Sequence, residues 1–138
     1  MIGTADHDAF IRSQKWAVVT SLRRDGSPTN SVVFFAIEGD EILFSTTLDR
    51  LKAKTLKRDP RCAITVLDEG PPYRFANVEG TARIEEQDIV PGHIMVNRVM
   101  RGAPDWQPPE GYEATLRQQG RVIVRLAAER VSGVVNRG

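Results

Sequence analysis

The sequence predicts a small, mainly β protein of the α+β class, a six-stranded antiparallel barrel with a few peripheral helices. The chain has 138 residues, a length typical of one domain, here residues 1–138. Six segments are rich in β-branched and aromatic residues, and tight turns join the first three. Strands joined by tight turns pair antiparallel, and few long helical segments separate them, so a small closed sheet is the expected architecture.

The expected strands begin as a meander. Asp25 and Gly26 lie between two apolar runs and give the strongest short-range signal for a hairpin. Gly39 marks a second tight turn. Gly80, in the middle of the fifth expected strand, indicates a bulge or the close approach of another backbone. The strands are expected at residues 16–22, 29–37, 41–46, 62–67, 73–84 and 121–126, and the last could extend through Val135.

Four helices are expected around these strands. Asp59 precedes a proline, a position that avoids the helical region, and therefore ends the second helix. Pro91 interrupts the third, and Gly120 closes the fourth. Trp106 lies in a proline-rich loop and would either cover a substrate or anchor that loop by packing. The helices are expected at residues 8–15, 48–59, 85–101 and 112–119.

Composition excludes several classes of protein. Hydrophobic residues make up 41% and charged residues 27%, which is ordinary for a globular protein, and a net charge of +1 argues against a broadly basic nucleic-acid binder. One cysteine excludes an internal disulfide and a multi-cysteine zinc site, and the two histidines match no metal spacing, so no metal is expected. The N-terminus has no signal-peptide pattern and no 18-residue apolar run occurs, so a cytoplasmic protein that does not enter the membrane is expected.

The sequence also lacks the common catalytic motifs. No glycine-rich phosphate loop and no nucleophile elbow is present. Cys62 falls within an apolar strand and is expected in the core, and His93 is expected to be structural or on the surface. Such a protein either binds without catalysis or takes its chemistry from a cofactor.

A local charge asymmetry indicates where an anion could bind. Residues 48–61 hold six basic and two acidic residues, a net charge of +4, whereas the rest of the chain holds 13 basic and 16 acidic residues, a net charge of −3. On a helical wheel most of these basic residues share one stripe, but Lys52 falls among the leucines of the other side. A lysine on an inward face must reach out to solvent or meet an anion.

Hydroxyl groups precede this helix. Ser45 and Thr46 end the third expected strand, and Thr47 or Asp49 could cap the helix. Two hydroxyls, the helix N-terminus and the charges of Arg50 and Lys52 would together suit a phosphate group. Ordinary helix capping and solvated surface charge is the alternative interpretation.

Three ordered motifs resemble a known family. Residues 17–28 (AVVTSLRRDGSP) are similar to the first hairpin of the pyridoxamine 5′-phosphate oxidase-like split β-barrels. Residues 45–61 resemble the phosphate-binding segment of that family and the strand that follows it, and residues 78–82 (VEGTA) resemble a later strand. The length and the ending at residues 131–133 resemble the short flavin and deazaflavin oxidoreductases, many of which use coenzyme F420.

The resemblance implies a six-stranded FMN-binding split barrel of Greek-key type that forms a homodimer, with two cofactor sites between the subunits. The ring of the cofactor would lie along the second strand, and two aromatic side chains of the partner would border it. The residues implied to bind cofactor are Ser45, Thr46, Thr47, Arg50, Lys52 and Lys54 around the phosphate, Ser31, Val32 and Val33 along the ring, and Tyr73 and Phe75 from the partner.

The resemblance also implies an oxidoreductase whose cofactor ring transfers the hydride, so no catalytic side chain is expected. The cofactor would be F420, acting on a small or conjugated organic substrate, or FMN in an oxidase or reductase. A flavin-binding protein without turnover is a further alternative. F420 carries a tail of several carboxylates that Lys54, Lys57, Arg58 and Arg61 could attract, whereas FMN would leave that stripe unused. A nucleic-acid-binding barrel is disfavoured because the basic helix carries no aromatic stacking residues.

Overall fold

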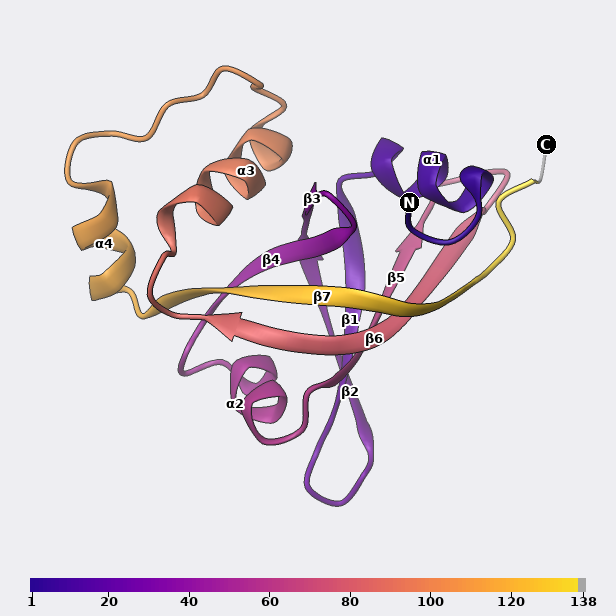
Figure 1. Ribbon diagram of the computed structural model, residues 1–138, viewed down its shortest axis with the longest axis horizontal. Helices are drawn as coiled ribbons and strands as arrows, with labels where there is room; N and C mark the ends of the chain where they lie inside the picture. The colour runs from indigo at the N-terminus through magenta and orange to yellow at the C-terminus, as the bar shows by residue number, and fades with distance from the viewer. Residues whose placement is uncertain (137–138) are drawn as a thin grey trace.

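The computed structural model describes residues 1–136, so the last two residues of the expected domain lie outside the described part (Figure 1). One antiparallel sheet contains seven strands in the order β2-β1-β5-β6-β7-β4-β3. The strands are β1 (Trp16–Leu22), β2 (Pro28–Phe34), β3 (Ala36–Glu38), β4 (Glu41–Thr47), β5 (Arg61–Leu67), β6 (Phe75–Glu85) and β7 (Arg121–Ser132). The helices are α1 (Ala5–Ser13), α2 (Leu51–Arg58), α3 (Val90–Arg101) and α4 (Tyr112–Gln118).

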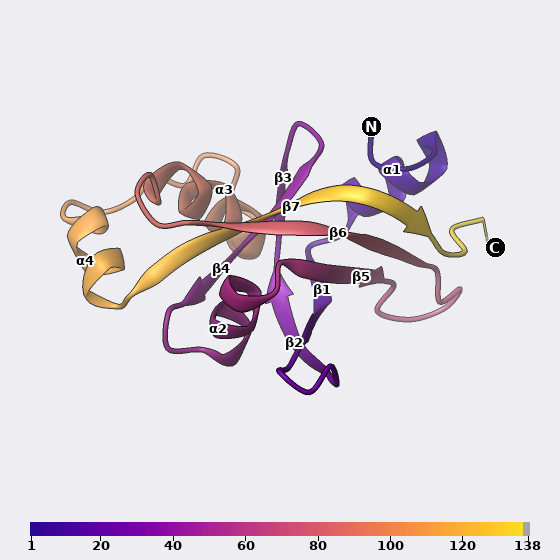
Figure 2. The ribbon, with the colours of Figure 1, turned by 60° about the horizontal axis from the view of Figure 1, so that its bottom comes forward.

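The sheet curls into a half-barrel, as expected, but it has seven strands rather than six. The single strand predicted at residues 29–37 is divided at Phe35, whose backbone N–H donates to the Lys15 carbonyl at 3.0 Å. Before that point the chain pairs with β1, and after it the chain pairs with β4. The two edges of the sheet are therefore joined through one residue, and Figure 2 shows the sheet bending so that β2 and β4 come near each other.

The core fills the concave side of this sheet. Phe35, Ile42, Phe44 and Ile64 are fully buried there and pack in one cluster with side chains from α1 and α2. Alternation along β1, where Ala17, Val19 and Ser21 point inward, gives the half-buried pattern typical of a strand with one covered face. Burying these side chains is the main stabilising contribution to the fold.

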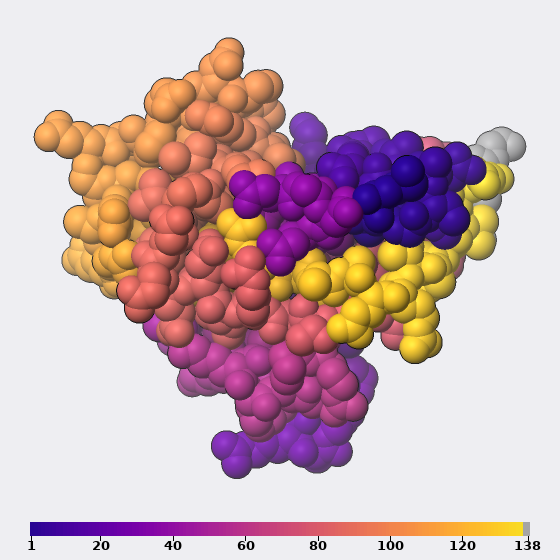
Figure 3. Space-filling model, viewed as in Figure 1, coloured from indigo at the N-terminus to yellow at the C-terminus, as the bar shows by residue number. Residues whose placement is uncertain are grey.

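α3 covers part of the other face of the sheet. Val96 packs with Ala36, Leu43 and Ile123 in a second, smaller apolar cluster over β3, β4 and β7. The space-filling view shows α3, α4 and their connection as one shoulder of the molecule, separate from the α1 segment at the opposite side (Figure 3). This placement sets α3 above the carboxyl end of β4, where the hydroxyls expected to bind phosphate lie.

The predicted helix boundaries need correction in three places. The first helix begins at Ala5 rather than at residue 8 and ends at Ser13 rather than at residue 15. The basic helix starts at Leu51, three residues later than expected, because the residues before it form a turn in which the Arg50 N–H donates to the Thr47 carbonyl. Leu48 and Leu51 are exposed rather than inward-facing. The third helix starts at Val90, so Pro91 lies in its first turn, where its missing N–H costs no hydrogen bond.

Two expectations for single residues in the strands are confirmed. Cys62 is buried in the core, and burial raises the pKa of its thiol to about 12. Gly80 lies at a shift of register between β6 and β7, and a Cβ atom there would stand 1.9 Å from the Ala127 carbonyl oxygen. Only glycine allows the two backbones to approach this closely.

Within residues 1–136, none of the four helices is both long and apolar enough to cross a membrane.

Candidate functional site: a cationic cleft between α2 and α3

A cleft of about 250 Å³ opens where β2 and β4 approach each other between α2 and α3. Its floor comes from the end of β4, one wall from β2 and α3, and the other from the start of α2 and the start of β7. The lining residues are Val32, Val33, Phe34, Ser45, Thr46, Arg50, Lys52, Val96, Met100 and Arg121.

Three cations converge on this cleft without an acidic partner. Arg50, Lys52 and Arg121 all line it, and none of them forms an ion pair within the described part of the chain. Lys52 is half-buried, and its pKa is lowered first by burial and then by the charges of Arg50 and Arg121. An anion in the cleft would relieve this repulsion and satisfy the buried charge.

Thr46 supplies an unsatisfied polar group at the same place. Its side chain is 2% exposed, and its hydroxyl oxygen has no hydrogen-bond partner in residues 1–136. A buried hydroxyl without a partner costs free energy, about 1–3 kcal/mol in typical cases. The oxygen of a bound anion would accept a hydrogen bond from this hydroxyl, so the residues present fit a phosphate group.

The start of α2 adds backbone donors. Its N-cap is Arg50, whose side chain makes no capping hydrogen bond. The capping role expected for Thr47 or Asp49 is therefore wrong: the Thr47 hydroxyl donates to the Asp49 carboxylate instead. The first N–H groups of the helix are left without a side-chain cap, and helix N-termini in this state favour anions.

His93 lies beneath the floor of the cleft, where it contacts Ser45. The Ser45 Oγ and His93 Nε2 atoms are 2.7 Å apart, and the other ring nitrogen, Nδ1, is 2.6 Å from the Ile89 carbonyl oxygen. Arg121 also reaches Ser45, with its Nη1 atom 3.4 Å from the hydroxyl oxygen. His93 is 2% exposed, and burial is the main cause that lowers its pKa.

An apolar wall borders the cations. Val32 of β2 is 66% exposed, and Phe34 of β2 and Met100 of α3 are about 40% exposed. All three line the cleft. Val33 lines it as well, but it is 7% exposed and packs in the main core cluster. Large exposed apolar groups that cluster beside a charged cleft are typical of a surface that binds a ligand or another chain.

Six of the residues named from the sequence therefore share one cleft: Val32, Val33, Ser45, Thr46, Arg50 and Lys52. The other five do not line it. Ser31 is half-buried on β2, Thr47 is engaged by Asp49, and Lys54 is exposed further along α2. Tyr73 lies in the connection between β5 and β6, Phe75 begins β6, and neither borders the cleft of its own chain.

The basic stripe expected to attract an acidic tail is mostly engaged within the chain. Lys57 pairs with Glu86 at 2.9 Å, Arg61 pairs with Asp59 at 2.6 Å, and Arg58 donates to the Leu22 carbonyl. Arg61 also belongs to β5 rather than to the helix. Of the four residues expected to attract the tail, Lys54 alone has neither an ion pair nor a side-chain hydrogen bond with the described residues.

The sequence analysis did not predict that Arg121 lines the cleft or that His93 contacts Ser45. Arg121 is more than 70 positions from Ser45, and it reaches the cleft because the pairing of β4 with β7 places it opposite Thr47. The proximity of His93 to Ser45 depends on how α3 packs over β4. In the sequence, Arg121 appears only as an arginine at the start of the last expected strand, and that strand could pair with the strand that contains Ser45.

Trp106 packs within its own chain and does not line the cleft. Its ring meets Tyr112 edge to face, with centroids 5.6 Å apart, and the Arg101 guanidinium lies 4.8 Å from its centroid. Its carbonyl accepts from Arg98 Nε at 2.9 Å. These contacts hold the proline-rich loop against α3 and α4.

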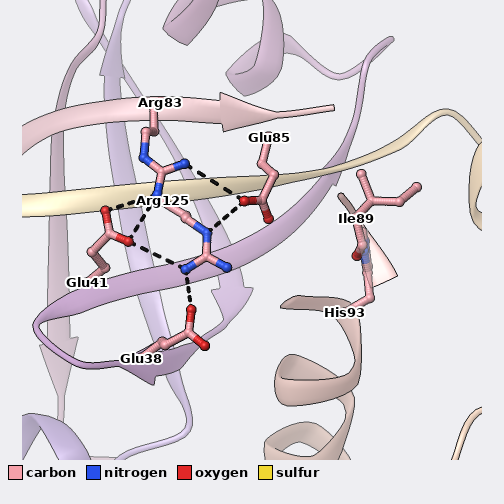
Figure 4. A network of polar contacts seen from close by, with 7 residues as sticks. All are labelled: Glu38, Glu41, Arg83, Glu85, Ile89, His93 and Arg125. Atoms are coloured by element: carbon pink, nitrogen blue, oxygen red, sulfur yellow. Dashed lines mark hydrogen bonds and ion pairs between the residues drawn. The ribbon is translucent and has the colours of Figure 1, made fainter. Parts of the chain in front are cut away.

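A second cationic cluster lies beside α3 but is neutralised. Arg125, 8% exposed in its side chain, pairs with Glu38 at 2.7 Å and with Glu85 at 3.2 Å, and Arg83 pairs with Glu41 at 3.2 Å (Figure 4). A hollow of about 430 Å³ near β1, β5 and β6 is lined by two arginines and two glutamates, so its charge is balanced as well. Among these sites the cleft between α2 and α3 is the one with uncompensated positive charge.

The fold and the cleft together define a small half-barrel protein with a cationic cleft beside an exposed apolar strand. The sequence model of the pyridoxamine 5′-phosphate oxidase family matches residues 4–135, and the chain belongs to that family. Solved structures agree with this fold. A conserved hypothetical protein from Mycobacterium tuberculosis is 24% identical with a TM-score of 0.81, over 98% of this chain and 86% of that chain. An F420 reductase is also 24% identical with a TM-score of 0.72, over 91% and 94% of the two chains. A heme storage protein from Vibrio cholerae is 16% identical with a TM-score of 0.72, over 100% and 98%.

Proposed function

We propose that this protein is an oxidoreductase that binds coenzyme F420, with the phosphate of the cofactor held in the cleft between α2 and α3. The observation that carries the proposal is that three cations without an ion pair, Arg50, Lys52 and Arg121, line one cleft together with Thr46, whose buried hydroxyl has no partner within residues 1–136. The similarity in fold to an F420 reductase supports the choice of cofactor.

Each part of the cleft has a distinct role in this proposal. Lys52 and Arg121 would pair with the phosphate oxygens, Thr46 would donate to one of them, and the start of α2 would add its backbone donors. Reduced F420, when bound, would supply a hydride to the organic substrate and become oxidised, and the substrate would take its second proton from bulk solvent. The chain itself would bind and orient the ring and shield it from water.

The cleft is too small for a whole flavin or deazaflavin. Sites for complete small-molecule ligands usually occupy about 300–1,000 Å³, whereas this one has about 250 Å³. The ring would therefore extend along the exposed side chains of Val32 and Phe34, and a second copy of the chain would cover it. Tyr73 and Phe75 are proposed to reach the ring from that second copy.

FMN is the second candidate, favoured by one observation. Lys57, Arg58 and Arg61 are engaged within the chain, so a long acidic tail would meet mainly Lys54 and the cations of the cleft. FMN needs only its phosphate held and has no such tail. A flavin-binding protein without turnover would use the same cleft and would differ only in leaving its cofactor unchanged by substrates.

A titration of the cofactor-free protein tests the proposal. We expect F420 to quench the protein fluorescence with a Kd below about 100 μM, equivalent to roughly −5.5 kcal/mol, and to bind more tightly than FMN. The same preparation should elute in gel filtration at twice the chain mass of 15.4 kDa. Tighter binding of FMN would select the second candidate, and failure of both cofactors to bind would reject the oxidoreductase function.

A further inference from the structure

His93 is buried, titratable and in contact with the candidate site, and the proposed function gives it no role. It lies in the first turns of α3, directly under Ser45. Figure 4 shows it with Ile89 at the start of α3, to one side of the charged network that Arg83, Arg125 and three glutamates of β3, β4 and β6 form. Its two ring nitrogens have different partners, and these partners determine which nitrogen carries the proton.

The neutral ring has one possible tautomer in this setting. The Ile89 carbonyl can only accept, so the Nδ1 atom 2.6 Å away must carry a proton and donate it. Nε2 is then unprotonated and accepts a hydrogen bond from the Ser45 hydroxyl at 2.7 Å. In this state the single proton of Ser45 points to the ring, and only its oxygen lone pairs are available to the cleft and to Arg121.

Protonation of the ring reverses the hydrogen bond at Ser45. The imidazolium donates from both nitrogens, so Nε2 would donate to Ser45 and the Ser45 hydroxyl would be free to donate into the cleft. The site would gain one hydrogen-bond donor and one positive charge. Both changes favour a bound anion.

We propose that His93 is a proton-linked positioning residue of the anion site, which turns the Ser45 hydroxyl toward the ligand when it is protonated. The inference rests on the proposed anion-binding role of the cleft. By linkage, binding of an anion raises the pKa of His93, and the anion binds more tightly as the pH falls through that pKa.

The surroundings of His93 define what else could titrate there. The charged groups that act on the ring are Arg121 of β7, which lowers its pKa, and Glu85 of β6, which raises it. Glu85 is held by Arg125 at 3.2 Å, and its other carboxylate oxygen is buried without a partner within the described residues. From α4, Tyr112 approaches α3 through Asn97, and burial raises the pKa of its hydroxyl.

Lys52 can also lose its charge as the pH rises. Burial, followed by Arg50 and Arg121, lowers the pKa of its amine, and burial is the main cause that lowers the pKa of His93. Deprotonation of either residue would weaken the binding of an anion at higher pH. The His93→Gln variant keeps Lys52, so the part of the pH dependence that this variant loses reports on histidine.

Sulfate is the appropriate probe, because it has the shape of phosphate and keeps its charge over this range. We expect the wild-type full chain to bind sulfate about tenfold more tightly at pH 5 than at pH 8. In His93→Gln the side chain can still accept from Ser45 but cannot become charged, so the affinity should stay near the wild-type value at pH 8. The matched control is His7→Gln, since His7 lies on α1 away from the cleft and should leave the pH dependence intact.

NMR titration of the His93 ring gives an independent readout that needs no variant of His93. Saturating sulfate should raise the pKa of this ring. A sulfate affinity independent of pH, an equal loss at every pH in His93→Gln, or an unmoved His93 pKa would each overturn the proposal. Sulfate binding with this pH dependence but no F420 or FMN binding would instead uphold the role of His93 and reject the proposed oxidoreductase function.

Discussion

Replacing Lys52 with alanine is expected to weaken the binding of F420 or FMN about 10- to 100-fold, or roughly 1.5–3 kcal/mol. Lys52 is half-buried in the cleft, and within the described residues it has no acidic partner. The amine is held where burial and two neighbouring arginines disfavour its charge, so a bound phosphate becomes its ion-pair partner. Fluorescence titration of both cofactors against the variant measures the loss.

The Lys52→Ala substitution should weaken cofactor binding without destabilising the fold. Burial, Arg50 and Arg121 lower the pKa of the amine in the folded state, which means that the charged form destabilises the cofactor-free fold. Removing it is expected to leave the melting temperature unchanged or raised. A side chain that costs stability but is needed for binding is typical of a functional site.

Lys57→Ala is the matched control for this prediction. It removes the same charge from the same helix, but Lys57 pairs with Glu86 on the surface and does not line the cleft. Its effect on cofactor affinity should stay within about twofold, as is common for exposed ion pairs. Equal losses in the two variants would show that general charge, and not the cleft, governs binding.

A Gly80→Ala substitution is expected to destabilise the fold by about 3 kcal/mol, because the added methyl group has no space. Its Cβ would stand 1.9 Å from the Ala127 carbonyl oxygen and 3.3 Å from the Glu129 nitrogen. Both are backbone atoms of the neighbouring strand, so relief requires the β6–β7 pairing to shift. Urea unfolding of the purified variant gives the free energy of unfolding directly.

Gly70→Ala provides the comparison within the same protein. Gly70 has no atom within 4 Å of its added Cβ and does not have a positive φ. We expect this variant to unfold within about 0.5 kcal/mol of the wild type. If Gly80→Ala were equally mild, the close approach at the bulge would not constrain the sheet.

Most of the fold could be predicted from local patterns. The strand at Trp16–Leu22 and the following turn at Asp25 and Gly26 match because alternation and hairpin chemistry are local properties. Gly80 was informative in the same way, because a glycine inside a strand usually marks a bulge or a close backbone approach. The division at Phe35 was missed because the apolar run through it is continuous, and only the tertiary arrangement sends its two halves to different partners.

The candidate site was predicted where its residues are close in sequence. Ser45, Thr46, Arg50 and Lys52 lie within eight positions, so a strand that ends before a helix brings them to one place. Arg121 was not predictable because the register of two strands far apart in sequence places it there. The sequence also could not show that Lys57 and Arg61 form ion pairs while Lys54 forms none. The pairs with Glu86 and Asp59 depend on contacts that the folded chain makes.

A crystal structure of the protein with bound F420 tests the central claim most directly. We expect the phosphorus atom in the cleft between α2 and α3, with phosphate oxygens within hydrogen-bond distance of Thr46, Lys52 and Arg121. The ring should lie along Val32 and Phe34. A phosphate bound elsewhere, for instance at Arg61 and Arg130 in the hollow near β1, β5 and β6, would contradict the assignment of the site.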